Sequence, residues 1–223
     1  MVQQAVFRPL IDGVSSRHNY VPVDLSKSNP DISAELVQDP QRCETFLEEY
    51  CEKRAALVAY GGYMENRDLY SQNGLFQEGE ARSLHLGLDF WCAADNHILA
   101  PFSGRIHSFA NNTAPGDYGP TLILEHRTEW SETPFEGFSL YGHLAEESLA
   151  NWVVGQEVNA GEVIAKLGEA HENGGYAPHL HFQLIFEMQD KKGDYPGVCA
   201  PSDQRRFAAN CPDPLPFLGL SAL

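Results

Sequence analysis

Short apolar runs, separated by turn-forming residues, dominate the middle of the chain. The separators are glycine, proline, asparagine and aspartate, as at residues 110–112 and 159–161. Runs of this length that do not alternate with long helices are typical of antiparallel strands. The candidate strands are residues 83–91, 97–109, 120–126, 138–142, 163–167 and 179–187. We therefore predict a mainly β fold with an antiparallel, sandwich-like or barrel-like core.

The first third of the chain carries the clearest helical pattern. Asp39 can cap a helix whose first residue is Pro40, and apolar residues then recur at helical spacing. We predict a helix over residues 40–56 and a short strand over residues 57–60, which a pair of glycines ends. The apolar stripe of this helix consists of Phe46, Leu47 and Tyr50. We expect the stripe to pack on the β core as a helical cover, and we assign it no functional site.

The remaining segments carry weaker patterns. A short helix is predicted over residues 146–150, and the tail after Gln189 is rich in proline, glycine and aspartate. We expect this tail to wrap the core as a loop, with one helical turn near Arg205 and Arg206. The predicted units are an N-terminal helical or irregular extension at residues 1–78, a β domain at residues 79–190 and a wrapping tail at residues 191–223.

Acidic residues outnumber basic ones, with 31 Asp and Glu against 15 Lys and Arg in 223 residues. The formal net charge of −16 repels nucleic-acid phosphates and anionic lipid headgroups, and the basic residues form no stripe. No apolar run approaches the roughly 20 residues that a membrane-spanning helix needs. Nucleic-acid binding and membrane insertion are therefore not expected, whereas the oligomeric state stays open.

The N-terminal sequence and the cysteines indicate in which cellular compartment the protein is expected. The first residues contain no apolar core of about 7–15 residues, so no secretory signal is expected. The five cysteines are odd in number, irregularly spaced and without a CxxC pair, which favours free thiols in a reducing compartment. We expect a cytoplasmic protein.

Two histidines share one face of the last candidate strand. His179-Leu180-His181 lies in the sequence PHLHFQLIF, where residues alternate as they do in a strand. Both imidazoles therefore project from the same face, about 6.5–7 Å apart. That separation suits one metal ligand and one neighbour that reaches a metal-bound water. The alternative is a buried pair whose nitrogens are satisfied by hydrogen bonds.

A second motif, His85-Leu86-Gly87-Leu88-Asp89, contains two more potential ligands. On a regular strand, residues four apart are separated by about 13 Å, which is too far for one metal ion. The two side chains converge only if the chain bends between them, and Gly87 is the position where a bend costs least. The alternative is an ordinary strand with a surface aspartate.

His85, Asp89 and His181 together offer two imidazoles and one carboxylate. A catalytic zinc site uses such a set and keeps its fourth position for water, whereas a structural zinc site closes that position with another ligand. The chain has no HExxH motif, so the glutamate base of the common zinc proteases is missing. His143, in the sequence LYGHL, and His179 are the spare imidazoles nearest to these ligands and are candidates for proton transfer.

Three motifs in this order, HLGLD, LYGHL and PHLHF, resemble those of the lysostaphin-type zinc endopeptidases, which include glycyl-glycine and peptidoglycan-cross-link peptidases. The intervening sequences APFSGRIHSF, DYGPTLILEH and VVGQEVNAGEVIAKLG are similar as well. The resemblance covers roughly residues 84–184. It implies a small antiparallel β scaffold of the duplicated hybrid motif kind, so residues 79–190 would form a zinc peptidase-like domain.

The resemblance also implies a role for each candidate residue. His85, Asp89 and His181 would be the ligands of a catalytic Zn²⁺, and His143 and His179 would form the catalytic pair. One of these imidazoles would take the proton of the zinc-bound water, and the other would steady the oxyanion or protonate the leaving amine. The implied activity is that of a zinc metalloendopeptidase acting on peptides or peptidoglycan-like substrates, possible examples being Gly-rich peptides.

Departures from the family pattern leave the substrate open. The loop at residues 172–177 differs from the usual Gly/Ser/Thr loop and should border the cleft, and Gln183 stands where glutamate is common. No export signal or wall-binding module is visible. The alternative function is a catalytically silent zinc-binding regulatory or interaction module of the same fold, although such members typically lack ligands and this chain lacks none. The other histidines are assigned structural or surface roles, and His126 is also a candidate for the cleft wall.

Overall fold

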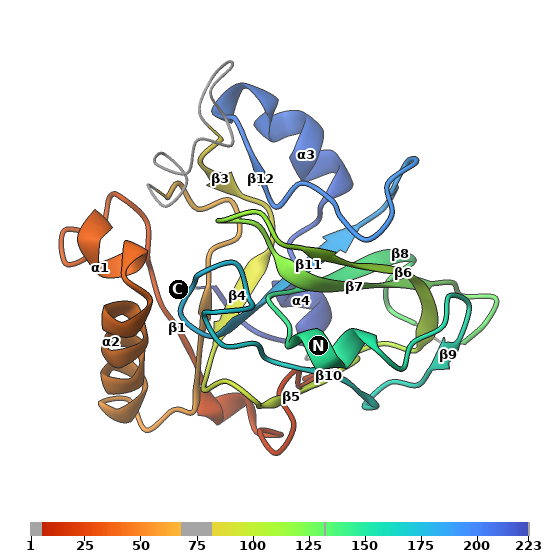
Figure 1. The fold of residues 1–223 in the computed structure, drawn as a ribbon, viewed down its shortest axis with the longest axis horizontal. Coiled ribbons are helices and arrows are strands. Elements are labelled where there is room, and N and C mark those ends of the chain that lie inside the picture. The colour runs from red at the N-terminus through yellow and green to blue at the C-terminus, as the bar shows by residue number, and fades with distance from the viewer. Residues whose placement is uncertain (1–5, 68–81, 132, 223) are drawn as a thin grey trace, which may run out of the picture.

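The fold is mainly β, as predicted (Figure 1). This computed structural model describes residues 6–67, 82–131 and 133–222. One large sheet has the strand order β1-β2-β4-β11-β8-β7-β6-β9, and two small sheets pair β10 with β5 and β12 with β3. The strands of the large sheet are β1 Tyr20–Pro22, β2 Val58–Gly61, β4 Leu88–Trp91, β6 Gly104–Asn112, β7 Gly119–His126, β8 Gly137–Gly142, β9 Glu157–Val158 and β11 His179–Ile185. The strands of the small sheets are β3 Leu84–His85, β5 His97–Leu99, β10 Val163–Lys166 and β12 Val198–Cys199.

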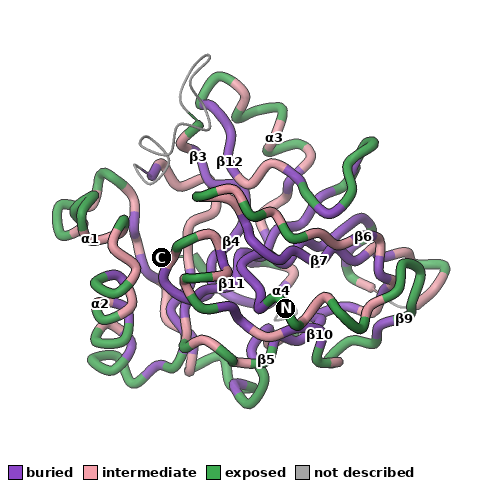
Figure 2. Tube along the Cα trace, in the orientation of Figure 1, coloured by how far each residue is buried: buried purple, intermediate pink, exposed green. Residues whose placement is uncertain are grey.

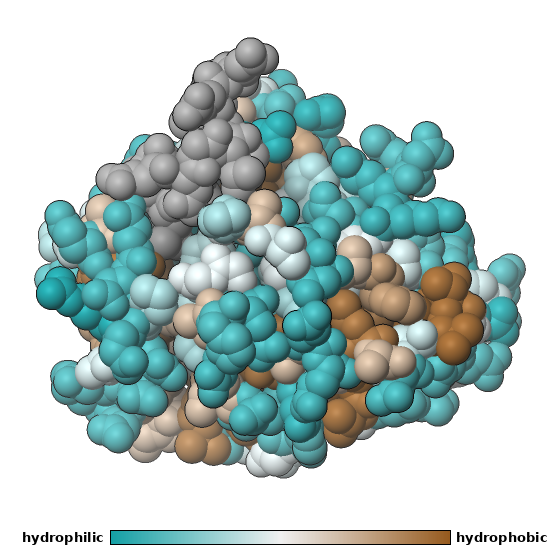
Figure 3. All heavy atoms as spheres, in the orientation of Figure 1, coloured by the Kyte–Doolittle hydropathy of each residue, from teal (hydrophilic) through white to brown (hydrophobic). Residues whose placement is uncertain are grey.

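Short helices surround the sheets, with α1 and α2 side by side at one edge of the molecule and α3 at another (Figure 1). The α-helices are α1 Ala34–Gln38, α2 Pro40–Glu52, α3 Gln204–Asn210 and α4 Leu215–Leu218. The 3-10 helices are η1 Arg17–Asn19, η2 Glu146–Leu149 and η3 Pro201–Asp203. Within the described ranges, no helix has the length and apolar character needed to cross a membrane. Hydrophilic residues cover most of the face seen in Figure 3, in keeping with the net charge of −16.

The large sheet is mixed. Its strand pairs are antiparallel except for β1 with β2, which run parallel. The N-terminal third therefore adds two strands to the sheet besides α1 and α2. Of these two strands, β2 was predicted from the sequence within one residue, whereas β1 was not. The expectation of a purely antiparallel arrangement is wrong at this edge.

Strand β11 lies at the centre of the core. All seven of its residues are buried, and it pairs with β4 on one side and β8 on the other (Figure 2). Leu180, Phe182 and Leu184 belong to the main hydrophobic cluster. Because successive side chains of a strand alternate between faces, His179 and His181 project from the opposite face. The predicted alternation of PHLHFQLIF is therefore present.

The strand predicted around the HLGLD motif is broken in two. β3 ends at His85 and pairs with β12, whereas β4 begins at Leu88 and pairs with β2 and β11. A Cβ atom at Gly87 would lie 2.7 Å from Nε2 of His181 and 2.8 Å from the carbonyl oxygen of Phe182. Only glycine permits this close approach. The chain thus bends at the glycine where the sequence predicted a bend.

Two predicted element boundaries are corrected. The single strand expected at residues 97–109 is two strands, β5 and β6, which belong to different sheets. Asp39 caps α2 as predicted, its side chain accepting a backbone N–H bond of 3.1 Å. However, α2 ends at Glu52 rather than at residue 56, because Ala55, with a positive φ of 53°, turns the chain toward β2.

Helix α2 packs against the sheet through what we term the second cluster. The second cluster comprises Val23, Leu25, Cys43, Leu47, Cys51, Ala56, Ala59, Trp91 and Ala177. Of the predicted apolar stripe, Leu47 is buried in this cluster, whereas Phe46 and Tyr50 are only partly buried against it. Because Ala59 and Trp91 lie on β2 and β4, the second cluster connects α2 to the sheet and to the strand that carries Asp89.

The C-terminal tail contains more regular structure than predicted. The helical turn expected near Arg205 and Arg206 is present as α3, and the tail also carries β12, η3 and α4. Leu215 and Leu218 of α4 are buried in the main hydrophobic cluster. A four-residue helix is unstable by itself, so it depends on this packing, which a local sequence pattern does not reveal.

His126 is a core residue and does not line a cleft. It is fully buried on β7, and its Nδ1 lies 2.8 Å from the Ser103 carbonyl oxygen and its Nε2 2.7 Å from Oγ of Ser139. Because a carbonyl oxygen only accepts, Nδ1 carries the proton. Burial lowers the pKa of this imidazole to about 4.

We expect His126 to make the stability of the fold depend on pH. The unfolded chain binds more protons than the folded one between the ordinary histidine pKa of roughly 6.5 and the folded value of about 4. The free energy of unfolding should therefore fall by about 3 kcal/mol from this residue as the pH drops through that window. Urea unfolding at pH 7 and pH 4.5 should show a smaller pH effect for His126→Gln than for the wild type. Equal pH effects in the two proteins would contradict this assignment.

Candidate metal centre

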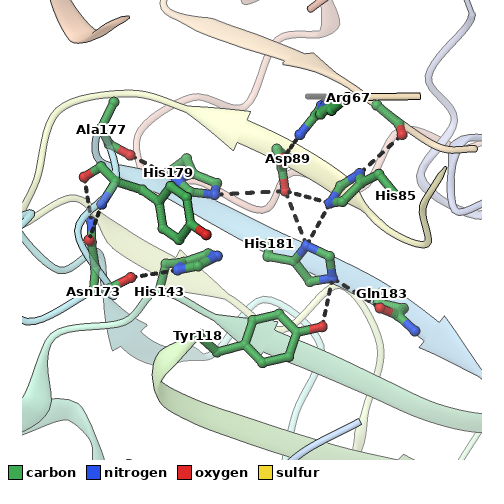
Figure 4. A network of polar contacts seen from close by, with 12 residues as sticks. Arg67, His85, Asp89, Tyr118, His143, Asn173, Ala177, His179, His181 and Gln183 are labelled. Atoms are coloured by element: carbon green, nitrogen blue, oxygen red, sulfur yellow. Dashed lines mark hydrogen bonds and ion pairs between the residues drawn. The ribbon is translucent and has the colours of Figure 1, made fainter. Parts of the chain in front are cut away.

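Three potential metal ligands converge at one point of the structure (Figure 4). His85 is the last residue of β3, Asp89 lies on β4, and His181 on β11 is the direct register partner of Asp89. Oδ1 of Asp89 lies 3.3 Å from Nε2 of His85 and 3.2 Å from Nδ1 of His181, and the two nitrogens are 2.9 Å apart. All three side chains are buried. The bend at Gly87 therefore brings residues of two separate motifs within reach of one ion.

The outer nitrogens of the two imidazoles are held by oxygen acceptors. Nδ1 of His85 donates to the Gly62 carbonyl oxygen at 3.0 Å. Nε2 of His181 donates to Oε1 of Gln183 at 3.0 Å, while the amide nitrogen of Gln183 donates to the Pro196 carbonyl oxygen at 3.2 Å. These bonds fix the tautomers, so that Nε2 of His85 and Nδ1 of His181 present lone pairs to the centre of the group.

This donor set suits a zinc ion. Two nitrogen lone pairs and a carboxylate oxygen face one another with no hydrogen between them, which is repulsive unless a cation lies among them. Two imidazoles and one carboxylate are a common ligand combination for zinc. Bonds of about 2.0–2.2 Å in a tetrahedral zinc site separate the ligand atoms by about 3.3 Å, close to the distances found here. The residues present therefore fit this metal.

The protonation states also suit metal binding. Burial lowers the pKa of His85 to about 4, so the imidazole is neutral. Burial alone would raise the pKa of Asp89, but the nearby His85 and the Arg67 guanidinium outweigh it and hold this pKa well below its ordinary value. Nη1 of Arg67 lies 2.5 Å from Oδ2 of Asp89. A neutral imidazole and an ionised carboxylate are the forms that coordinate metals.

His143 and His179 form a second pair of imidazoles beside this group (Figure 4). Their ring centroids are 4.2 Å apart, and Nε2 of His179 lies 3.9 Å from Oδ1 of Asp89. Nδ1 of His143 donates to the Asn173 carbonyl oxygen and Nδ1 of His179 to the Ala177 carbonyl oxygen, both at 2.7 Å. Each Nε2 is therefore the unprotonated nitrogen. Burial lowers the pKa of both imidazoles, which keeps them neutral and able to accept a proton.

The backbone of His143 adopts an uncommon conformation. Its φ of 62° lies in the left-handed region, where a residue with a Cβ atom costs roughly 1 kcal/mol or more. The His143 N–H donates to the Tyr118 carbonyl oxygen at 2.8 Å, and its own carbonyl oxygen accepts from the Gly168 N–H at 3.0 Å. These two bonds hold the turn that directs the imidazole toward His179 at the end of β8.

All five candidate residues line one pocket of about 300 Å³. The loop at residues 172–177 contributes Tyr176 and Ala177, so it borders the pocket as expected. The amide of the fully buried Asn173 fixes this loop by bonds to backbone groups of Gly168, Gly175 and Tyr176. A pocket that combines neutral bases with a group of potential metal ligands is an arrangement suited to hydrolysing an amide bond.

Several residues of this pocket were not predicted from the sequence. Trp91 stacks on His179 with ring centroids 5.9 Å apart, and it lies two residues beyond Asp89 on the same face of β4. The Tyr118 hydroxyl lies 3.4 Å from Nε2 of His181. The alternation of residues along a strand could have placed Trp91 on the same face as Asp89. The sequence DYG, which lies in a segment similar to the family, could have drawn attention to Tyr118. No sequence pattern points to Arg67, because it lies outside every motif.

Comparison with known proteins relates residues 83–193 to a family of peptidases. Residues 83–193 match Peptidase family M23. The catalytic domain of the antimicrobial peptidase lysostaphin from Staphylococcus simulans is 26% identical over 61% of this chain and 80% of that chain, with a TM-score of 0.41. Another structure of lysostaphin from this organism is 25% identical over 60% of this chain and 43% of that one, with a TM-score of 0.40. A zinc-containing peptidase from Vibrio cholerae is 25% identical over 51% of this chain and 32% of that one, with a TM-score of 0.36.

The present chain thus spans less than half of the length of the last two proteins. No curated protein matches it. The segment matched by the family contains all three motifs and all five candidate residues. The resemblance predicted from those motifs is confirmed, and residues 83–193 of this chain belong to Peptidase family M23.

Proposed function

We propose that this member of family M23 is a zinc-dependent metalloendopeptidase that hydrolyses peptide bonds. The observation that carries the proposal is the position of two neutral imidazoles, His143 and His179, beside the convergent ligand set in the same pocket. The ligand set and the proton-transfer groups are the two components that hydrolysis of an amide needs. Both occur together here.

His85, Asp89 and His181 would hold the zinc ion. When bound, zinc would lower the pKa of a water molecule to about 7 and polarise the carbonyl of the scissile bond. Within the described part of the chain, no fourth His, Cys, Asp or Glu joins these three ligands. Three protein ligands leave one position of a tetrahedral site for water or substrate, which is typical of catalytic rather than structural zinc.

The protein itself would move the protons. The free Nε2 atoms of His143 and His179 can each accept a proton from the attacking water, and the resulting imidazolium can pass it to the leaving amine. Because Nδ1 of each ring is anchored on a backbone carbonyl oxygen, the rings are held in a productive orientation throughout. While it holds that proton, the imidazolium can donate a hydrogen bond to the oxyanion.

This division of roles predicts two classes of variant. His143→Ala and His179→Ala should lose about 10²–10⁴-fold in peptide hydrolysis and still bind one zinc ion, because neither is a ligand. His85→Ala should lose both zinc and hydrolysis, and chelation should inactivate the wild type. Zinc content by atomic emission and cleavage of peptidoglycan, pentaglycine and mixed peptides measure these effects. The exposed His171→Ala serves as the control and should match the wild type.

The outcomes separate the two candidate functions. Zinc-loaded wild-type protein that cleaves none of these substrates would favour the silent regulatory module. Undiminished hydrolysis by both His143→Ala and His179→Ala would remove them from the mechanism. A wild-type protein that binds no stoichiometric zinc would overturn the proposed function itself.

The pocket also supports a preference for an apolar side chain beside the scissile bond. Four residues of the second cluster, among them Leu25 and Trp91, line one side, and Val37 of α1 extends this apolar wall. Trp91 stacks on His179 with an angle of 23° between the planes, so the wall begins at a proposed catalytic imidazole. An apolar substrate side chain would gain burial there that a glycine does not offer.

Paired substrates test this preference. A peptide in which one glycine of a pentaglycine is replaced by leucine should be cleaved with a higher kcat/KM than pentaglycine itself. Val37→Asp should reduce that advantage about tenfold, because the charge disrupts an apolar wall. Val153→Asp, a change at a valine that is 66% exposed and outside the pocket, is the matched control. Equal kcat/KM values for the two peptides in the wild type would contradict the preference.

A further inference from the structure

We propose that Arg67, which lies outside the segment matched by family M23, is a positioning residue that orients Asp89 for metal binding. The proposal rests on the ligand set of the proposed function. It concerns a part of the chain to which the sequence analysis assigned no site. Through Arg67, the N-terminal third of the chain would contribute directly to the geometry of the metal centre.

The guanidinium of Arg67 is fixed between two carboxylates. Only 2% of its side chain is exposed. Nη1 donates to Oδ2 of Asp89 at 2.5 Å, and Nε donates to Oε2 of Glu65. The other oxygen of Glu65 accepts the Leu25 N–H at 3.0 Å, and the guanidinium carbon lies 5.4 Å from the ring centroid of Trp91. The guanidinium of Arg67 is therefore held in place by two carboxylates and one aromatic ring.

The contact with Arg67 decides which oxygen of Asp89 faces the imidazoles. Because Oδ2 is engaged by Nη1, Oδ1 is the atom that lies 3.3 Å from His85 and 3.2 Å from His181. Asp89 is thereby held as a donor of one oxygen rather than two. A single donated oxygen keeps a coordination position free for the substrate or water that a catalytic site requires.

The same segment also orients His85. The Gly62 carbonyl oxygen accepts the Nδ1–H of His85, and backbone bonds join the Met64 N–H to the His85 carbonyl oxygen (2.8 Å) and the His85 N–H to that of Glu65 (3.0 Å). Gly62 has a φ of 107°, and a Cβ atom there would collide with Arg67 and lie 2.9 Å from Nδ1 of His85. Residues 62–67 therefore contact two of the three proposed ligands, His85 and Asp89. Glycine at position 62 leaves room for both His85 and Arg67.

The charge balance gives Arg67 a second effect. Glu65, Arg67 and Asp89 are all buried or nearly so, with one positive and two negative charges. Removal of the guanidinium leaves two carboxylates without their buried partner, and these would repel each other and move. A lysine keeps the charge but not the planar fork, so it cannot bond both carboxylates with the same geometry. Arg67→Lys therefore removes the geometry alone, whereas Arg67→Gln removes the charge as well.

The experiment compares Arg67→Lys and Arg67→Gln with the wild type. Zinc affinity is measured by competition with a chromophoric chelator, and the visible absorption spectrum of the cobalt-loaded protein reports the coordination geometry. We expect each variant to bind zinc about 10–100-fold more weakly, the range typical when a group behind a metal ligand is lost. The cobalt spectrum should change as well. Arg127→Lys and Arg127→Gln are the controls, because Arg127 also bonds a carboxylate, that of Glu125, but at the partly exposed end of β7.

Folding is controlled independently. Thermal unfolding and circular dichroism identify variants that fold, and if neither Arg67 variant folds, Glu65→Gln replaces them. Glu65→Gln leaves the guanidinium in place but removes its anchor, and it should weaken zinc binding by about tenfold. Folded Arg67 or Glu65 variants with zinc affinity within twofold of the wild type and an unchanged cobalt spectrum would overturn the proposal.

The proposed function fails differently. A wild-type chain that binds no zinc defeats the ligand set itself. A wild-type chain that binds zinc, loses it in His85→Ala and keeps it fully in Arg67→Lys and Arg67→Gln defeats only the role of Arg67.

Discussion

The buried carboxylate of Asp89 is the charge on which the arrangement of the site depends. Its side chain is 3% exposed, and withdrawing a carboxylate from water costs several kcal/mol unless partners compensate. Arg67 supplies a positive charge to one oxygen, while His85, His181 and His179 approach the other within 3.9 Å. The ionised group therefore requires that four elements meet at this point: the segment before β3, β3 itself, β4 and β11.

The sheet provides this meeting point through register and one glycine. His181 stands directly opposite Asp89, and a shift of one residue between β4 and β11 would turn every side chain of the strand to the other face. Gly87 allows the chain to leave β3 and enter β4 close against His181. The N-terminal strands β1 and β2 extend the sheet beyond β4, on the side opposite to β11. This extension places α2 and the second cluster at the edge of the pocket. Site and fold are thus parts of one packing arrangement.

The sequence was informative wherever a short-range pattern specified the geometry. Alternation in PHLHFQLIF predicts that His179 and His181 share a face, and the glycine in HLGLD predicts the bend between His85 and Asp89. Arg67 was not predictable, because it lies 22 residues before Asp89 and reaches it only through long-range packing. Helix α4 and strands β1, β9 and β12 were missed for a related reason, since elements of two to four residues owe their stability to tertiary contacts rather than local propensity.

X-ray absorption at the zinc edge of the zinc-loaded full chain identifies the ligands of the metal. We predict one zinc ion with only nitrogen and oxygen neighbours at about 2.0–2.2 Å and the outer scattering of two imidazole rings. Cys43 also lines the pocket, so a competing site would reveal itself by a sulfur neighbour at about 2.3 Å. A sulfur neighbour, or scattering that requires fewer or more than two imidazoles, would contradict the assignment of His85, Asp89 and His181.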